Sequence, residues 1–363
     1  MLTSKTWTDG SKAAEYYLSD EATDQVGPAI WVGRGRTLFQ GISDTVDSET
    51  LIHLADYTGE SGRQRKAIID LTFTAPKPVS IYAALVDDPK REQIVAVHVG
   101  AARKALERIE ADYALAKMSM GTAQNIIRQV DGRLRPVRPR LGRGKGKKDD
   151  AAKDPDKEQV YLRTHNLIAA LFTHFCTRPV DGEPDPNLHT HCVIPRITSR
   201  ADKESVTLYL DVDTRAPEVN HPYLDHLLDG LKRLGIKAQR SASLDIAIDG
   251  IPDALLDAFS RRSRKIGATA EAMTPGDYRQ PTPAEKRLAA IFTREPKGNV
   301  PWTERIPGWR RRALAATVGE EIEQLQGLLS DELMQQLWKR FWRHQEQQTP
   351  RPQGPASELF PGA

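Results

Sequence analysis

Residues 166–194, NLIAALFTHFCTRPVDGEPDPNLHTHCVI, are typical of the central hairpin of an antiparallel sheet. Two strand-like runs, residues 160–178 and 188–200, are joined by the turn-rich PVDGEPDPN, which brings the second strand back antiparallel beside the first. Residues two apart on a strand point to one face, so His189 and His191 can reach the same ion. His174 lies on the preceding strand. Three neutral imidazoles suit a divalent metal ion, and histidines that pair within the sheet without metal are the alternative.

The two cysteines of the chain flank these histidines. Cys192 directly follows His191, so its side chain faces away from the metal and is expected in the core. Cys176 lies two residues after His174 on the same face and is an alternative ligand. Two cysteines cannot form a disulfide framework, which favours a reducing compartment.

Two adjacent tyrosines, Tyr16 and Tyr17, lie in SKAAEYYLSD, a short predicted helix with Ser11 as its cap. A phenol has a pKa near 10, so a tyrosine nucleophile needs help from a base or a metal. Adjacent tyrosines can equally be packing residues. The next segment, WVGRGRTLFQG, has closely spaced glycines that predict a turn whose backbone approaches another part of the chain.

Asp70 is an acidic residue inside an apolar strand, DLTFTAPKPVS, that Pro76 and Pro78 end. Strands disfavour aspartate, so Asp70 either faces water at an edge or is held by a partner such as a metal-binding histidine or a tyrosine hydroxyl. A long amphipathic helix is predicted over residues 91–118.

The second half of the chain reads as helices and short strands. We expect a helix over about 223–234 that ends at Gly235, a strand at LDIAIDG and a helix in PDALLDAFSRRSRKI with Pro252 in its first turn. Two further helices are expected between Val318 and Gln345.

Length and charge set broader bounds. With 363 residues, the chain is two units or one enlarged α+β body with appendages. Its 52 Lys and Arg against 49 Asp and Glu give a net charge of only +3. The positive charge nevertheless concentrates in Arg128 to Lys148, Arg261 to Lys265 and Trp302 to Arg312, which predicts a basic groove for DNA.

Two of these basic stretches have a second interpretation. The Gly-, Pro- and charge-rich segment from Arg128 to Asp156 is either a solvated linker or a DNA-contacting arm. The Trp and Arg cluster at 302–312 either stacks bases or forms a helix with a buried aromatic face. No apolar run reaches the ~18–20 residues of a membrane helix and no signal peptide is evident, so we expect a cytoplasmic protein without membrane insertion.

Five segments, in order, resemble the N-terminal relaxase domain of the MobF family, the TrwC/TraI-like DNA-nicking enzymes of the HUH superfamily. They are AAEYYLSD, WVGRGRTLFQG, DLTFTAPKPVS, NLIAALFTHFCTR and DPNLHTHCVI, and the likeness spans about residues 11–300. The resemblance implies an α+β fold with a central antiparallel, palm-like sheet flanked by helices and a C-terminal helical extension. Residues 1–268 would form the catalytic domain, 269–348 a helical DNA-clamping or accessory region, and 349–363 a disordered tail.

The resemblance also implies roles for particular residues. Tyr16 would attack a phosphodiester at a plasmid origin of transfer and stay joined to the 5′ end, with Tyr17 beside it. Asp70 would orient a histidine and help to remove the tyrosine proton. His174, His189 and His191 would hold one Mg²⁺ or Mn²⁺, and Lys77 and Arg178 would lie beside the DNA. The expected partners are single-stranded DNA, relaxosome accessory proteins and a type IV secretion coupling protein in the bacterial cytoplasm.

The chain departs from the family pattern in three places. EATDQVGPAI lacks a second tyrosine pair, so Tyr17, a second protomer or the reverse reaction would have to complete transfer. The turn between His174 and His189 is longer than usual, which predicts either a displaced His174 or a larger DNA-contacting loop. The chain has no GxxxxGK[ST] motif, so we expect no helicase activity.

Three other functions are consistent with parts of the pattern. A rolling-circle replication initiator would use the same metal and tyrosine chemistry. A histidine-metal hydrolase of small molecules would need the histidines and tolerate Tyr16→Phe. A DNA-binding accessory protein with a degenerate site would bind DNA without forming an adduct.

Overall fold

The structure of the chain is a computed structural model. It describes residues 2–18, 24–39, 41–56, 68–129, 134–137, 158–214, 217–241, 245–274, 279–296, 298, 300–317, 332, 334, 335 and 339. Most of the basic segment 128–156, nearly all of the helices expected between residues 318 and 345, and the tail 349–363 therefore lie outside the described residues.

A five-stranded antiparallel sheet forms the centre of the molecule, with strand order β1-β3-β7-β6-β2. Its strands are β1 (Leu2–Trp7), β2 (Ile30–Val32), β3 (Ile68–Thr74), β6 (Ala169–Cys176) and β7 (Pro186–Pro195). The hairpin of β6 and β7 is the one that the histidine pattern predicts. All residues of β6 are buried, which explains its nearly continuous apolar sequence.

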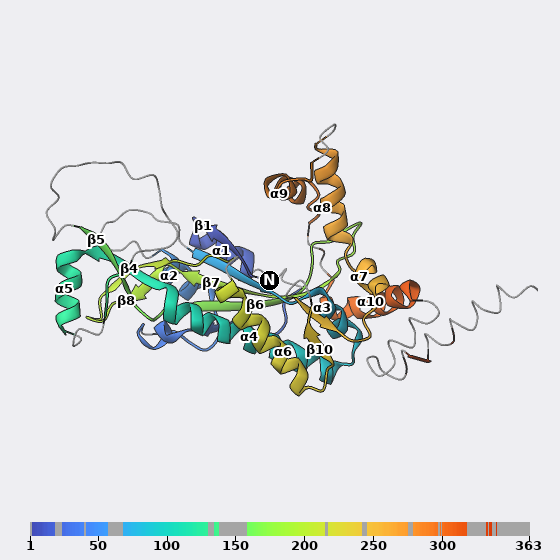
Figure 1. Ribbon diagram of the computed structural model, residues 1–363, viewed down its shortest axis with the longest axis horizontal. Coiled ribbons are helices and arrows are strands. Elements are labelled where there is room, and N and C mark those ends of the chain that lie inside the picture. The colour runs from blue at the N-terminus through green and yellow to red at the C-terminus, as the bar shows by residue number, and fades with distance from the viewer. Residues whose placement is uncertain are drawn as a thin grey trace, which may run out of the picture.

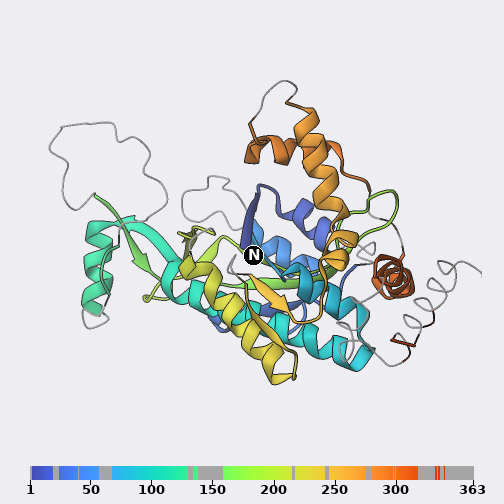
Figure 2. The same cartoon turned by 45° about the vertical axis from the view of Figure 1, so that its right-hand side comes forward.

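Helices cover both faces of this sheet. On one face, Phe172 and Val193 pack with α1 (Gly10–Leu18) and α2 (Ser48–Ala55). On the other, Leu171 and Cys192 belong to a larger apolar core with α3 (Lys77–Leu85), α4 (Asp88–Tyr113) and α6 (Pro217–Arg233). We call the first the front face and the second the back face. Figures 1 and 2 show α4 and α6 running side by side along the back. The predicted α+β sandwich is confirmed.

A second sheet lies at one end of the molecule, with order β5-β4-β9-β8 (Figure 1). Its strands are β4 (Ala114–Ser119), β5 (Gln159–Arg163), β8 (Ile197–Ser199) and β9 (Ser205–Leu210), and α5 (Met120–Gln129) packs beside it. The helix predicted over residues 91–118 is wrong at its end: it stops at Tyr113, and β4 begins at Ala114. Pairing with β5 and β9 supplies β4 with hydrogen bonds that helical spacing alone cannot reveal.

The C-terminal helices stand at the other end. They are α7 (Asp253–Ala258), α8 (Arg261–Ala272), α9 (Pro283–Phe292) and α10 (Trp302–Ala316), after the small sheet of β10 (Ala238–Arg240) and β11 (Ile246–Ile248). The single helix expected after Pro252 is two helices that break at Phe259 and Ser260, and Phe259 is fully buried. Figures 1 and 2 show α8 and α9 rising from the body. The predicted domain boundary at 268/269 falls within α8, and the division into units stays a prediction.

Two further details differ from expectation. Helix α1 begins at Gly10 and is capped by Asp9, whose carboxylate accepts the Lys12 N–H at 3.1 Å, rather than by Ser11. Helix α3 begins between the two prolines, with Pro76 at its N-cap and Pro78 in its first turn, where proline is tolerated. No helix in the described part of the chain combines the length and apolar character needed to cross a membrane.

The glycine turn is as expected. Gly33 has a φ of 97°, and a Cβ there would lie 2.3 Å from the Leu167 carbonyl oxygen. A Cβ on Gly35 would lie 2.7 Å from the same oxygen, which accepts the Gly35 N–H. The turn is a 3₁₀ helix, η1 (Arg34–Thr37), and it fixes β2 beside the start of β6.

Candidate metal and tyrosine site

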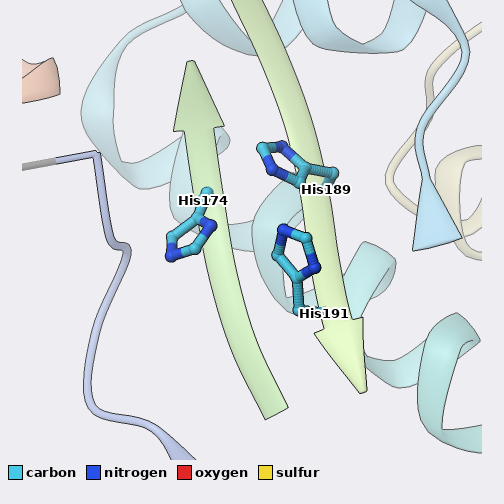
Figure 3. A group of neighbouring side chains, drawn as sticks. All are labelled: His174, His189 and His191. Carbon is cyan, nitrogen blue, oxygen red and sulfur yellow. The ribbon is translucent and has the colours of Figure 1, made fainter. Parts of the chain in front are cut away.

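Three histidine side chains gather on the front face of the β6–β7 hairpin (Figure 3). His174 pairs directly with His189, and His191 is two residues further along β7. The ring centroids are 5.1–5.3 Å apart, and one nitrogen from each ring lies within 4.8 Å of the other two. This donor set fits one divalent ion with coordination positions left open for another ligand. Cys176 is not part of this cluster.

The long turn does not displace His174. The register of β6 and β7 shifts between His174 and Cys176, so the extra residues of the turn are taken up beyond the histidines. Residues of this turn form hydrogen bonds with the C-terminal helical region. Asp185, only 1% exposed, accepts from Arg261 of α8 at 3.0 Å and Arg312 of α10 at 2.7 Å. Glu295 accepts the Asp181 and Gly182 N–H groups at 3.0 Å each.

Asp70 is buried on the front face, where it holds one histidine and one tyrosine. Both of its carboxylate oxygens are 3.0 Å from His191 Nδ1, and the Tyr17 hydroxyl donates to Oδ2 at 2.6 Å. Burial opposes ionisation, but the hydrogen bonds from His191, Tyr17 and Thr72 outweigh it and lower the pKa of Asp70. An ionised Asp70 favours a proton on His191 Nδ1, which leaves Nε2 as the metal donor.

The two adjacent tyrosines have different environments. Tyr17 is 1% exposed and stacks on Phe172 at 5.0 Å. Burial and the Asp70 carboxylate raise the pKa of Tyr17, so it remains a phenol at neutral pH. Tyr16 is half-buried and lines a cavity of about 420 Å³ together with the three histidines. Its ring packs against Trp7 at 5.3 Å and Tyr17 at 4.9 Å.

Most of the residues that line the cavity are polar or charged, and three of them are arginines. Arg178 follows β6, Arg262 comes from α8, and Arg294 follows α9. The family resemblance implies Arg178, and the clustering of charge indicates the basic run 261–265, but no local signal identifies Arg294. Lys77 does not line this cavity. Its ammonium donates to the Pro186 carbonyl at 3.1 Å, and burial lowers the pKa of Lys77.

The Trp and Arg side chains of α10 contact other residues of the chain. Trp302 stacks on Phe175 at 4.8 Å, and the Nε1–H of the buried Trp309 donates to the Pro184 carbonyl at 3.0 Å. Arg310 pairs with Asp87 at 3.1 Å. Of the two interpretations, the helix with a buried aromatic face is correct for this part of the chain.

A buried polar network supports the hairpin from the back face. His98 of α4 is fully buried, with Nδ1 2.9 Å from the Tyr223 hydroxyl and Nε2 2.9 Å from the Thr190 hydroxyl. Thr190 is in turn 2.9 Å from the Thr173 hydroxyl. Burial lowers the pKa of His98 to about 3, so the ring is neutral. Thr190 lies between His189 and His191, and Thr173 precedes His174, so the network fixes both strands at the triad. Cys192 on this face is fully buried, as expected.

The chain matches one family model and resembles solved structures. The family model described as "TrwC relaxase" matches residues 4–134 and 150–316. The conjugative relaxase TrwC, in a metal-bound complex with oriT DNA, is 26% identical with a TM-score of 0.64 over 86% of this chain and 97% of that one. A metal-free TrwC–oriT complex is 25% identical with a TM-score of 0.63, over 86% and 97%.

Two curated relatives are much longer than the region matched. The multifunctional conjugation protein TraI of Escherichia coli K12 is 25% identical over 254 residues, which is 65% of this chain and 12% of TraI. A second Escherichia coli TraI is 23% identical over 331 residues, 85% of this chain and 16% of that protein. The chain thus spans less than a fifth of the length of either relative.

Proposed function

The chain belongs to the TrwC relaxase family, and from this premise we propose that it nicks and rejoins one DNA strand at a plasmid origin of transfer. The observation that carries the proposal is that Tyr16, the histidine triad and three arginines line one cavity. A nucleophile, a candidate metal site and phosphate-binding cations are the parts that transesterification of a phosphodiester requires.

In the proposed reaction, the Tyr16 hydroxyl oxygen attacks the scissile phosphorus. The Tyr16 O–P bond forms as the P–O3′ bond breaks, so the 5′ phosphate becomes tyrosine-linked and the 3′ oxygen leaves as a hydroxyl. The phenolic proton passes to solvent in the cavity, and the leaving 3′ oxygen takes a proton from the same solvent. Asp70 accepts from Tyr17 and His191, so we do not assign it the removal of the Tyr16 proton that the resemblance implies. Attack by a 3′ hydroxyl on the phosphotyrosine reverses the step without ATP.

The three histidines would hold one divalent cation, for which we propose Mg²⁺ or Mn²⁺. When bound, such an ion neutralises charge that develops on the non-bridging phosphate oxygens. Asp70 orients His191 toward it by fixing the Nδ1 proton. Tyr17 donates to Asp70 Oδ2 and packs against Tyr16, so its role is to position the site.

Arg178, Arg262 and Arg294 would hold phosphates of the bound strand. Of these, Arg262 also donates to the Ala290 and Thr293 carbonyls at 2.7 Å each, which fixes α8 to the end of α9. A DNA contact by Lys77 would require its ammonium to leave the Pro186 carbonyl. Buried Tyr17 is poorly placed for a second cleavage, so a second Tyr16 or the reverse reaction would complete transfer. Relaxosome accessory proteins and a coupling protein in the bacterial cytoplasm are the proposed partners.

The proposal is tested with labelled oligonucleotides from the transfer origin of the plasmid that encodes the chain. With Mg²⁺ or Mn²⁺, the wild-type protein should form an adduct that survives a denaturing gel. Tyr16→Phe should form none, whereas the matched control Tyr17→Phe should retain it. An adduct in Tyr16→Phe, or none in the wild type on any segment of the origin, would refute the tyrosine mechanism.

A further inference from the structure

Lys5 is a cation beside Tyr16 that has no part in the proposed reaction. Lys5 lies on β1, the edge strand of the central sheet, directly opposite Asp70 of β3. Residues that face each other across an antiparallel pair project to the same side. The Lys5 side chain therefore rises from the front face, in the row that contains Asp70.

The ammonium of Lys5 rests on aromatic rings. Its Nζ is 3.5 Å from the centroid of the Trp7 ring and 5.6 Å from that of Tyr16, the same two rings that pack against each other. A cation over an aromatic face is attracted to the ring but keeps its full charge. Trp7 thus holds the ammonium beside Tyr16 without neutralising it.

The carboxylate closest in register does not pair with Lys5. Asp70 is occupied by His191, Tyr17 and Thr72, and among the described residues no carboxylate forms an ion pair with Lys5. Burial lowers the pKa of Lys5, whereas Tyr16 and Asp70 oppose that shift, and Arg294 and Arg178 add to it. Lys5 on β1 therefore lies beside Tyr16, outside the cavity lining that Tyr16 shares with Arg178 and Arg294.

Building on the proposed function, we propose that Lys5 is a catalytic residue that contacts a non-bridging oxygen of the scissile phosphate from the Tyr16 side. A mobile point charge suits an oxygen whose negative charge grows as the Tyr16 oxygen approaches phosphorus. Because that charge is largest in the transition state, Lys5 should affect the rate of cleavage more than the affinity for DNA.

The test compares Lys5→Met with Lys12→Met in single-turnover cleavage at saturating protein. Methionine keeps an apolar stem against Trp7 and removes the charge. Lys12, an exposed lysine of α1, serves as the control. Lys5→Met should cleave about 10- to 100-fold more slowly, with the Kd for the oligonucleotide changed less than about threefold. Lys12→Met should match the wild type, and Lys5→Arg should recover most of the rate.

The outcomes separate this inference from the proposed function. If the wild type cleaves DNA and Lys5→Met cleaves it at the same rate, the proposed role of Lys5 is wrong and the proposed function stands. A weakened Kd with an unchanged rate at saturation also overturns it, because Lys5 would then be a binding contact only. Failure of the wild type to form any adduct overturns the proposed function and Lys5 with it. A melting temperature for Lys5→Met within about 2 °C of the wild type excludes misfolding as the cause of a slow rate.

Discussion

The front and back faces of the central sheet share the strand β7 yet have opposite environments. On the front, His189 and His191 are half-buried and line the cavity. On the back, Thr190 between them is fully buried and bonded to His98. Because successive side chains of a strand point to opposite faces, the candidate metal ligands and the residue that supports them alternate along β7. We therefore expect substitutions on the front face to change activity and substitutions on the back face to change stability.

The two tyrosines should give the largest contrast. Tyr16→Phe removes the proposed nucleophile and should lower adduct formation at least about 10³-fold. Tyr17→Phe removes one donor to Asp70, which is about 1 kcal/mol, and should slow cleavage no more than about tenfold. Adduct yield on denaturing gels measures both. Equal losses in the two variants would mean that exposure to the cavity does not select the nucleophile.

A histidine from the front face comes next. His191→Ala should lower cleavage by about 10²-fold or more and weaken binding of Mn²⁺, because the triad loses one donor. Its free energy of unfolding without metal should change by no more than about 1.5 kcal/mol, since Asp70 keeps Tyr17 and Thr72 as donors. Calorimetric metal titration and urea unfolding are the measurements. A variant that loses stability but binds Mn²⁺ normally would contradict the assignment of faces.

A histidine from the back face should give the reverse result. His98→Phe leaves the Tyr223 and Thr190 hydroxyls without their shared partner and should lower the free energy of unfolding by about 2–4 kcal/mol. Cleavage at a temperature where the variant is folded should stay within about tenfold of the wild type. Urea unfolding and the adduct assay are run side by side. If cleavage fell as far as in His191→Ala, the back face would be part of the chemistry.

The pH dependence of stability should show a smaller effect from the same histidine. The pKa of His98 is about 3 in the fold against 6.5 when exposed, so below pH 6.5 the unfolded chain binds a proton that the folded chain does not. The wild type should therefore lose up to about 1.4 kcal/mol per pH unit as pH falls from 6.5 toward 3. His98→Phe lacks this contribution, so its deficit should shrink between pH 7 and pH 5 in urea unfolding. A constant deficit would mean that folding does not shift the pKa of His98.

Much of the site can be predicted from local pattern. The spacing of His189 and His191, the antiparallel return past His174 and the unusual acid at Asp70 all follow from the period of a strand. The close approach of Gly33 and Gly35 follows from the conformational freedom of glycine. These features depend on a few neighbouring residues, which is why the sequence reveals them.

What the sequence does not reveal depends on long-range pairing. Lys5 shares a face with Asp70 only because β1 pairs with β3 in one register. His98 looks like any residue of an amphipathic helix until α4 is packed beneath Thr190. The acidic turn after Arg178 resembles a solvated loop, and only the fold brings Arg261 and Arg312 to Asp185.

The register shift between His174 and Cys176 has a consequence for how such a chain can diverge. Insertions or deletions on the turn side of that bulge change the loop and leave the histidines aligned. A single inserted residue on the other side, between His189 and His191 or within β6, would turn every following side chain over and point Thr190 or its neighbours at the substrate. Length variation among relatives should therefore be tolerated in the turn between Cys176 and Pro186 and absent from the paired residues of β6 and β7, a boundary that a library of one-residue insertions along the hairpin would locate.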